Sequence, residues 1–151
     1  MTRFSRSVVG VFTLAAAASL AGCNKNNSPT VPTAVQVTED KTGTVPVGGK
    51  DQKNFTVNYT YDYSSASVKL NSLKLASGAD ASTTIGVGFG SIAFDGSCVL
   101  SSQATANAMN VGQTSTTGFI FSAGNFCTLV FDSGTLTNLG PVTYSLTIVH
   151  Y

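Results

Sequence analysis

Segment 55–63 alternates apolar and polar side chains without a break, and this pattern restricts the fold more than any other feature of the chain. Its apolar and aromatic positions are Phe55, Val57, Tyr59, Tyr61 and Tyr63. Successive side chains of a strand point to opposite faces, so the segment is predicted to be an antiparallel strand buried on one face. After the first 22 residues no segment keeps an apolar period of about 3.6 residues, and helix is therefore expected to be nearly absent.

Further short runs of strand-forming residues follow, and turns rich in Gly, Asn and Ser separate them. The runs contain Val68, Leu70, Leu73 and Leu75; Ile85, Val87, Phe89, Ile92 and Phe94; Phe119 and Phe121; Cys127, Leu129 and Phe131; and Val142, Tyr144, Leu146 and Ile148. Turns are expected at 77–78, 95–96, 123–125 and 139–141. A change of parity after Leu70 predicts a bulge at Asn71 and Ser72. Together these features predict an all-β chain with a single antiparallel β-sandwich of the jelly-roll or immunoglobulin type.

The composition limits the kinds of partner that the chain can have. Charged residues make up 10% of the sequence, with 8 basic and 7 acidic side chains. This balance provides no basic field for nucleic acid, so nucleic acid is not expected as a partner. About 129 residues follow the first 22, which is enough for one domain with a core but not for two. Low charge, 15 Gly and no Trp resemble exported bacterial β-proteins more than cytosolic enzymes.

The N-terminus resembles the signal and lipid-attachment box of a bacterial lipoprotein. Arg3 and Arg6 precede an apolar stretch from Val8 to Leu20, and Leu20-Ala21-Gly22-Cys23 closes it. The stretch is too short and too interrupted to span a membrane and is expected to be removed. The resemblance implies that Cys23 is acylated and becomes the new N-terminus; the alternative is an ordinary signal peptide. We expect residues 1–22 to be the signal, 23–33 a flexible tether and 34–151 the β-sandwich domain.

The remaining cysteines, Cys98 and Cys127, form an even pair if Cys23 carries the lipid. In the oxidising compartment that an exported chain enters, such a pair is expected to form a disulfide. A metal pair or a reactive thiol is the alternative, but the spacing is not C-x-x-C and the chain contains one histidine. The predicted link closes a loop of about 29 residues.

A second resemblance covers residues 43–151 and concerns the pre-peptidase C-terminal type of β-sandwich. It rests on Gly43-Thr-Val-Pro-Val-Gly-Gly49 followed by Phe55-Thr-Val57, on Ser67-Val-Lys-Leu70 and Ile85-Gly-Val-Gly-Phe-Gly90, and on Ser122-Ala-Gly-Asn-Phe-Cys-Thr-Leu-Val-Phe-Asp132 with Tyr144-Ser-Leu-Thr-Ile-Val149. The resemblance implies a β-sandwich and carries little information on function. The chain departs from the family in Cys98 and Cys127, and it lacks the acidic D-x-D patch, which argues against an inherited calcium site.

Few residues qualify for catalysis or metal binding. Gly86, Gly88 and Gly90 lack the following helix of a phosphate-binding loop, so they are interpreted as a strand face that lets a ring or a backbone pack closely. His150 is the only histidine and is expected at a fraying strand end. Asp95 and Asp132 are weak candidates for calcium ligands and are otherwise turn residues. We therefore expect no enzyme activity and no cofactor.

Tyr59, Tyr61 and Tyr63 are the candidates for ligand stacking, because three rings on one strand face can form a platform for sugars. Burial in the core is the alternative. The hypothesis from sequence is a lipid-anchored module at the outer membrane or cell surface that binds a glycan or an envelope protein. The alternatives are a structural envelope component without a small ligand and an accessory domain of a secreted-hydrolase system.

Overall fold

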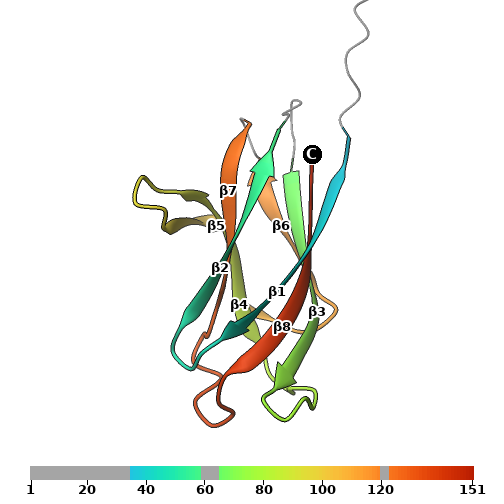
Figure 1. The fold of residues 1–151 in the computed structure, drawn as a ribbon, viewed down its shortest axis with the longest axis vertical. Helices are drawn as coiled ribbons and strands as arrows, with labels where there is room; N and C mark the ends of the chain where they lie inside the picture. The colour runs from blue at the N-terminus through green and yellow to red at the C-terminus, as the bar shows by residue number, and fades with distance from the viewer. Residues whose placement is uncertain (1–34, 59–64, 120–122) are drawn as a thin grey trace, which may run out of the picture. The chain divides into compact units, whose positions relative to one another are not determined.

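The computed structural model describes residues 35–58, 65–119 and 123–151, and within these ranges it contains eight strands and no helix. The strands are β1 (Val37–Val45), β2 (Lys50–Val57), β3 (Ser65–Leu75), β4 (Ile85–Ile92), β5 (Cys98–Met109), β6 (Thr114–Phe119), β7 (Gly124–Phe131) and β8 (Val142–His150). They form two antiparallel sheets, a first sheet of order β1-β8-β3-β6 and a second sheet of order β2-β7-β4-β5 (Figure 1).

The connections between the described strands identify the type of sandwich. Each strand lies in the other sheet from its predecessor, except β5, which forms a hairpin with β4 in the second sheet. This order of eight strands in two four-stranded sheets is that of a jelly roll, whereas immunoglobulin domains divide their strands differently. The predicted antiparallel β-sandwich is therefore confirmed, and the topology selects the jelly roll.

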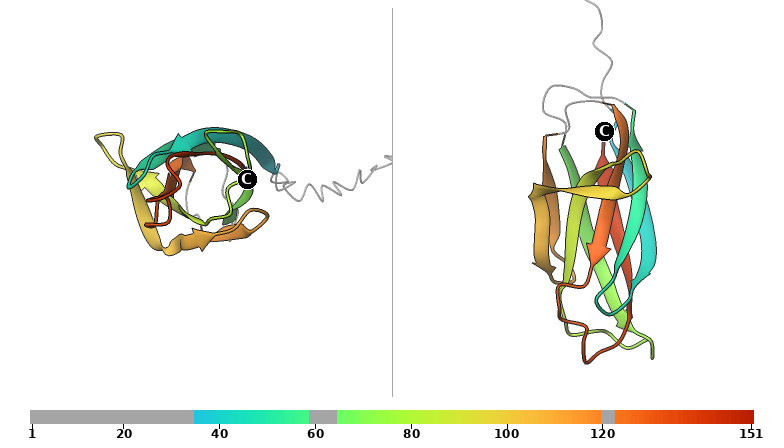
Figure 2. Two further views of the ribbon diagram at one scale, coloured as in Figure 1. Left: turned by 90° about the horizontal axis from the view of Figure 1, so that it is seen from below. Right: turned by 90° about the vertical axis from the view of Figure 1, so that its left-hand side faces the viewer.

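The core lies between the two sheets and follows the period of two in the sequence. In β8, which is paired with β1 on one side and β3 on the other, Val142, Tyr144, Leu146 and Ile148 are all buried. Phe55 and Val57 of β2 and Val87 of β4 approach them from the second sheet and belong to the same core cluster. Viewed end-on, the strands surround this common interior (Figure 2).

Two local features predicted from the sequence are confirmed. The pairing of β3 with β8 shifts register between Leu70 and Ser72, which is the predicted bulge. Gly78 and Gly140 lie in turns with φ of 83° and 78°, which a side chain would strain.

Other boundaries differ from the prediction. Gly124 and Asn125, expected in a turn, already belong to β7 and pair with β2. The strand expected to run through Phe94 ends at Ile92, so Phe94 lies in the hairpin turn. β5 was not predicted, because this edge strand is rich in small and polar residues. In the structure its pairing with β4 shifts register between Gly88 and Gly90. Phe121 lies outside the described residues.

The glycine face of β4 is explained by close packing. A Cβ atom on Gly86 would lie 2.2 Å from the ring of Phe131, and one on Gly90 would lie 2.1 Å from the backbone carbonyl oxygen of Val99. A ring and a backbone occupy the space of the missing side chains, as the sequence interpretation expected. All residues from Ile85 to Gly90 are buried.

Candidate functional site

Several predicted site residues cannot be placed. Cys23 and the tether, together with Tyr59, Tyr61 and Tyr63, lie outside the described residues. The acylation of Cys23 and the tyrosine platform therefore stay predictions. The candidate surface is built from the described strands alone.

The predicted disulfide is present. Cys98, the first residue of β5, is bonded to Cys127 of β7, with 5.8 Å between the Cα atoms. Since β4 separates these strands in the second sheet, the bond ties the β4–β5 hairpin back onto the sheet. Cys127 is fully buried.

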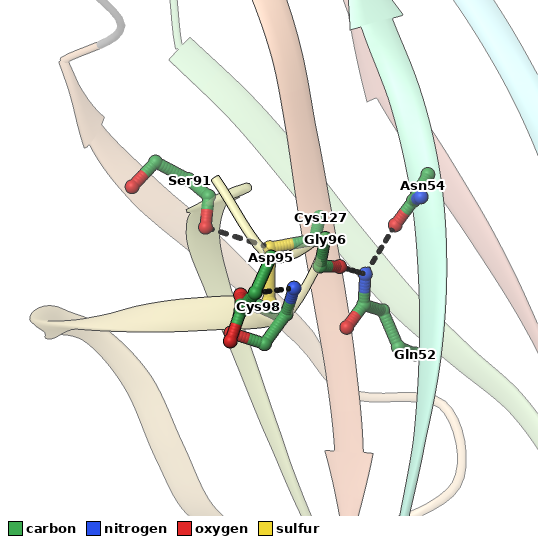
Figure 3. Close-up of a disulfide and its surroundings, with 8 residues drawn as sticks. Gln52, Asn54, Ser91, Asp95, Gly96, Cys98 and Cys127 are labelled. Atoms are coloured by element: carbon green, nitrogen blue, oxygen red, sulfur yellow. Dashed lines mark hydrogen bonds between the residues drawn. A yellow bond between two sulfur atoms is a disulfide. The ribbon is translucent and has the colours of Figure 1, made fainter. Parts of the chain in front are cut away.

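The hairpin turn folds over the outer face of the second sheet. The Gly96 carbonyl oxygen accepts a hydrogen bond of 3.0 Å from Nε2 of Gln52 on β2, and the same nitrogen donates to Oδ1 of Asn54 at 2.8 Å. Figure 3 shows this arrangement, with Gly96 beside Cys127 and Gln52 reaching toward it from β2. The disulfide and the Gln52 contact together hold the turn against the sheet.

A shallow pocket of about 460 Å³ adjoins this turn. Its lining residues come from four strands that are distant in sequence: Glu39, Asn54, Phe55, Thr56, Ile92 and Asn125. The polar lining is mostly uncharged, because two carboxamides and a hydroxyl accompany a single carboxylate. Ile92 and Phe55 add apolar surface. Sequence reasoning missed this pocket, because the sequence indicated it only through the polar side chains on one face of β2.

The carboxamides of the pocket are oriented by their neighbours. Oδ1 of Asn54 accepts from Gln52, and Oδ1 of Asn125 accepts a 2.9 Å hydrogen bond from the Thr56 hydroxyl. With both amide oxygens engaged, each Nδ2 group retains N–H donors for another molecule. The surface can therefore donate hydrogen bonds to a polar, uncharged ligand.

Glu39 connects the pocket with a buried histidine. Oε1 of Glu39 lies 2.9 Å from Nε2 of His150, whose ring is 1% exposed and 5.2 Å from the ring of Phe55. Lys41 forms an ion pair with the other carboxylate oxygen. Burial raises the pKa of the Glu39 carboxyl, but hydrogen bonds from Lys41 and His150 outweigh it and hold the pKa below its usual value.

The expectation of a fraying His150 was wrong. β8 is an inner strand of the first sheet, and His150 pairs with Val37 of β1. The strand pairing with β1 therefore extends as far as His150. Nδ1 of His150 has no hydrogen-bond partner among the described residues.

A second carboxylate occupies a similar place further along the same edge. Oδ2 of Asp51 on β2 accepts a 2.9 Å hydrogen bond from the hydroxyl of Tyr144 and pairs with Lys53 at 3.1 Å. Burial raises the pKa of the Tyr144 phenol, and the Asp51 carboxylate raises it further. Gly43 leaves room for this contact, because a Cβ there would lie 1.9 Å from Oδ2 of Asp51.

Asp95 and Asp132 are not joined in one site. Asp95 follows β4 and Asp132 follows β7. Because these two strands are antiparallel neighbours, their C-terminal ends lie at opposite ends of the second sheet. Oδ1 of Asp95 accepts from the hydroxyl and the backbone amide of Ser97 at 2.6 and 2.9 Å. These hydrogen bonds lower the pKa of the Asp95 carboxyl.

Asp132 organises a turn through backbone amides. Oδ2 accepts from Gly48 at 2.8 Å, and Oδ1 accepts from Gly134, Thr135 and Leu136. These hydrogen bonds, that of Gly48 foremost, lower the pKa of the Asp132 carboxyl. Within the described residues no group of three or more His, Cys, Asp or Glu side chains is arranged to hold a metal ion.

Comparison with family models and with curated sequences provides no relative for this chain. No protein-family model matches it, and no curated protein matches it in sequence. Among the described residues there is no helix of the length and hydropathy required to cross a membrane.

Proposed function

We propose that the protein is a lipid-anchored module of the bacterial cell envelope, of the pre-peptidase C-terminal type, that binds a ligand without catalysis. The binding surface is the pocket at the β1–β2 side of the sandwich, close to the β4–β5 turn. The observation that carries the proposal is the pocket lined by Asn54, Thr56 and Asn125, which offers uncharged hydrogen-bonding groups beside apolar surface. Binding sites combine these two kinds of lining.

The anchor is supported by the lipid-attachment box at Cys23. Roughly 13 residues separate Cys23 from Val37, and an extended segment of this length spans about 45 Å. Such a tether gives a single domain reach above a membrane surface. The two or more acyl chains that lipoprotein processing adds are enough for stable attachment.

The alternative of a structural component that assembles through sheet edges has less support. Edge strands β1 and β2 turn charged side chains toward the interior, with Glu39 and Lys41 on one and Asp51 and Lys53 on the other. Inward-pointing charges on edge strands oppose pairing with another chain. Binding through a face of the sheet is therefore the better-supported mode.

The test measures binding of the full chain purified in detergent to an array of envelope glycans and to separated envelope proteins. The double variant Asn54→Ala/Asn125→Ala is expected to lose at least about tenfold in affinity for the ligand that binds. Thr42→Ala, an exposed substitution on β1 of the first sheet, is the matched control and should bind as the original chain does. Absence of binding to both classes of ligand would overturn the proposal.

A further inference from the structure

Phe94 at the tip of the β4–β5 hairpin is the most exposed large apolar side chain among the described residues, at 111% of its reference area. Exposure of a full aromatic ring forgoes on the order of 2 kcal/mol of burial energy. Phe94 is the second residue of the four-residue turn 93–96. This position accepts most residue types, so the turn itself does not require an aromatic ring.

The backbone that carries Phe94 is held in place. The amide of Gly96 donates to the Ala93 carbonyl at 2.9 Å, and the amide of Ala93 donates to the Ser97 carbonyl at 2.8 Å. Gly96 adopts φ of 83°, as a three-residue hairpin turn requires. Oδ1 of Asp95 accepts a hydrogen bond from the amide of Ser97, and the disulfide follows at Cys98. The ring is therefore presented from a braced turn.

The residues on either side of Phe94 connect its turn with the pocket. Two residues earlier, Ile92 lines the pocket, and two residues later Gly96 contacts Gln52, which holds the pocket residue Asn54. Phe94 therefore lies two residues along the chain from a residue of the pocket lining. Phe94 is fully exposed, unlike the aromatic ring of Phe55 in the pocket lining, which is buried.

The charges at the pocket define the class of ligand. Among the described residues of the lining, Glu39 is the only charged one, and Lys41 and His150 engage its carboxylate. The described lining contains no basic side chain that could bind a phosphate, and its one carboxylate is too few for a cation. The Nδ2 donors of Asn54 and Asn125 match hydroxyl oxygens, whereas Phe94 and Ile92 match a face of C–H groups.

Resting on the proposed function, we propose that the ligand is a neutral saccharide, whose ring stacks on Phe94 while its hydroxyls accept hydrogen bonds from Asn54 and Asn125. Aromatic rings gain from contact with an apolar ligand face, and the fixed turn limits the entropy lost on binding. Phe94 is a further candidate for ring stacking, beside the tyrosines that the sequence interpretation proposed. The disulfide at Cys98 holds the hairpin whose turn carries this ring.

The experiment uses the full chain in detergent and arrays of neutral hexose oligosaccharides, acidic oligosaccharides and peptides. We expect binding to the neutral oligosaccharides, a loss of about tenfold with Phe94→Ala, and retained affinity with Phe94→Tyr, which keeps the ring. Val99→Ala, an exposed apolar substitution on the same hairpin, is the matched control. Equal thermal unfolding temperatures of the variants would show that all of them are folded.

The outcomes separate this inference from the proposed function. Binding to a protein or an acidic glycan that depends on Asn54 and Asn125, without neutral saccharide binding, overturns the inference and leaves the proposed function standing. Neutral saccharide binding that Phe94→Ala does not change also overturns it. Absence of all binding removes both.

Discussion

Glu39 and Asp51 show how single residues close the side of the sandwich. Each is a carboxylate on an edge strand, and each accepts a hydrogen bond from a buried polar side chain of β8, His150 or Tyr144. A lysine two positions along the same strand pairs with each carboxylate. The buried polar groups of β8 thereby obtain partners that an apolar edge would not provide.

Glu39 is predicted to make stability depend on pH. Its folded pKa lies below the unfolded value of about 4.3, so its contribution is present above that pH and is lost as the pH falls through the folded pKa. Glu39→Gln should reduce the free energy of unfolding by about 1 kcal/mol at neutral pH and by less in acid. Urea unfolding at a series of pH values measures the difference.

Asp40→Asn is the matched control for Glu39→Gln. Asp40 is the next residue of β1, and its exposed carboxylate accepts from Thr147 rather than from His150. The two substitutions remove the same charge. A difference between Glu39→Gln and the original chain that stays constant from neutral pH to pH of about 3 would contradict the predicted linkage.

Gly90 and Gly88 are predicted to tolerate a methyl group differently. In Gly90→Ala the new Cβ meets the backbone of Val99, which cannot move aside, so the loss should be on the order of 3 kcal/mol. In Gly88→Ala the nearest atoms, at 2.8 to 3.1 Å, belong to the side chains of Thr105 and Leu100, and the loss should be about 1 kcal/mol. Equal unfolding midpoints in urea would be evidence against close packing of β4 and β5.

At the scale of elements, the β4–β5 hairpin depends on long-range links. Its turn is held by the bond from Cys98 to Cys127 and by the contact of Gly96 with Gln52 of β2. The pairing of β4 and β5 itself is interrupted between Gly88 and Gly90. Four residues of β5, 101–104, lie there opposite a single residue of β4, so three of them are extra. The disulfide compensates for a strand that is weakly specified by its own sequence.

Removal of the disulfide is predicted to destabilise the domain substantially. The double variant Cys98→Ala/Cys127→Ala should lose about 3.5 kcal/mol, because the bond restricts a loop of 29 residues in the unfolded chain. Thermal unfolding with and without a reducing agent measures the effect. Reduction should lower the unfolding temperature of the original chain and leave that of the variant unchanged; an original chain insensitive to reduction would refute the prediction.

At the scale of the whole molecule, the proposed anchor at Cys23 predicts a defined mature protein. Intact mass of the membrane-extracted chain should show loss of the first 22 residues, added acyl mass and a formed Cys98–Cys127 bond. Cys23→Ala should abolish the acyl mass. A cleaved chain without acyl mass would identify an ordinary signal peptide instead.

Much of the fold was predictable because the period of two is a local property. It placed the core faces of β3 and β8 and the bulge after Leu70, and the even pair of cysteines indicated the disulfide. In β7 the predicted run of Cys127, Leu129 and Phe131 lies on the face away from the core, and Val130 enters the core instead. β1, the start of β2 and β5 were harder to predict, because edge strands need not be apolar. Asp51 and Lys53 place charged side chains where the alternation of β2 would put apolar ones, and the two pair with each other.

The sequence by itself determined the all-β class, the core faces of β3 and β8 and the cysteine pair, because alternation and composition are properties of the chain itself. Only the tertiary structure decided the jelly-roll order, the burial of His150 against Glu39, and the pocket beside Phe94. Alternation shows which residues share a face, but not which element covers that face. That choice depends on pairings between segments far apart in sequence, such as β1 with β8 and β2 with β7.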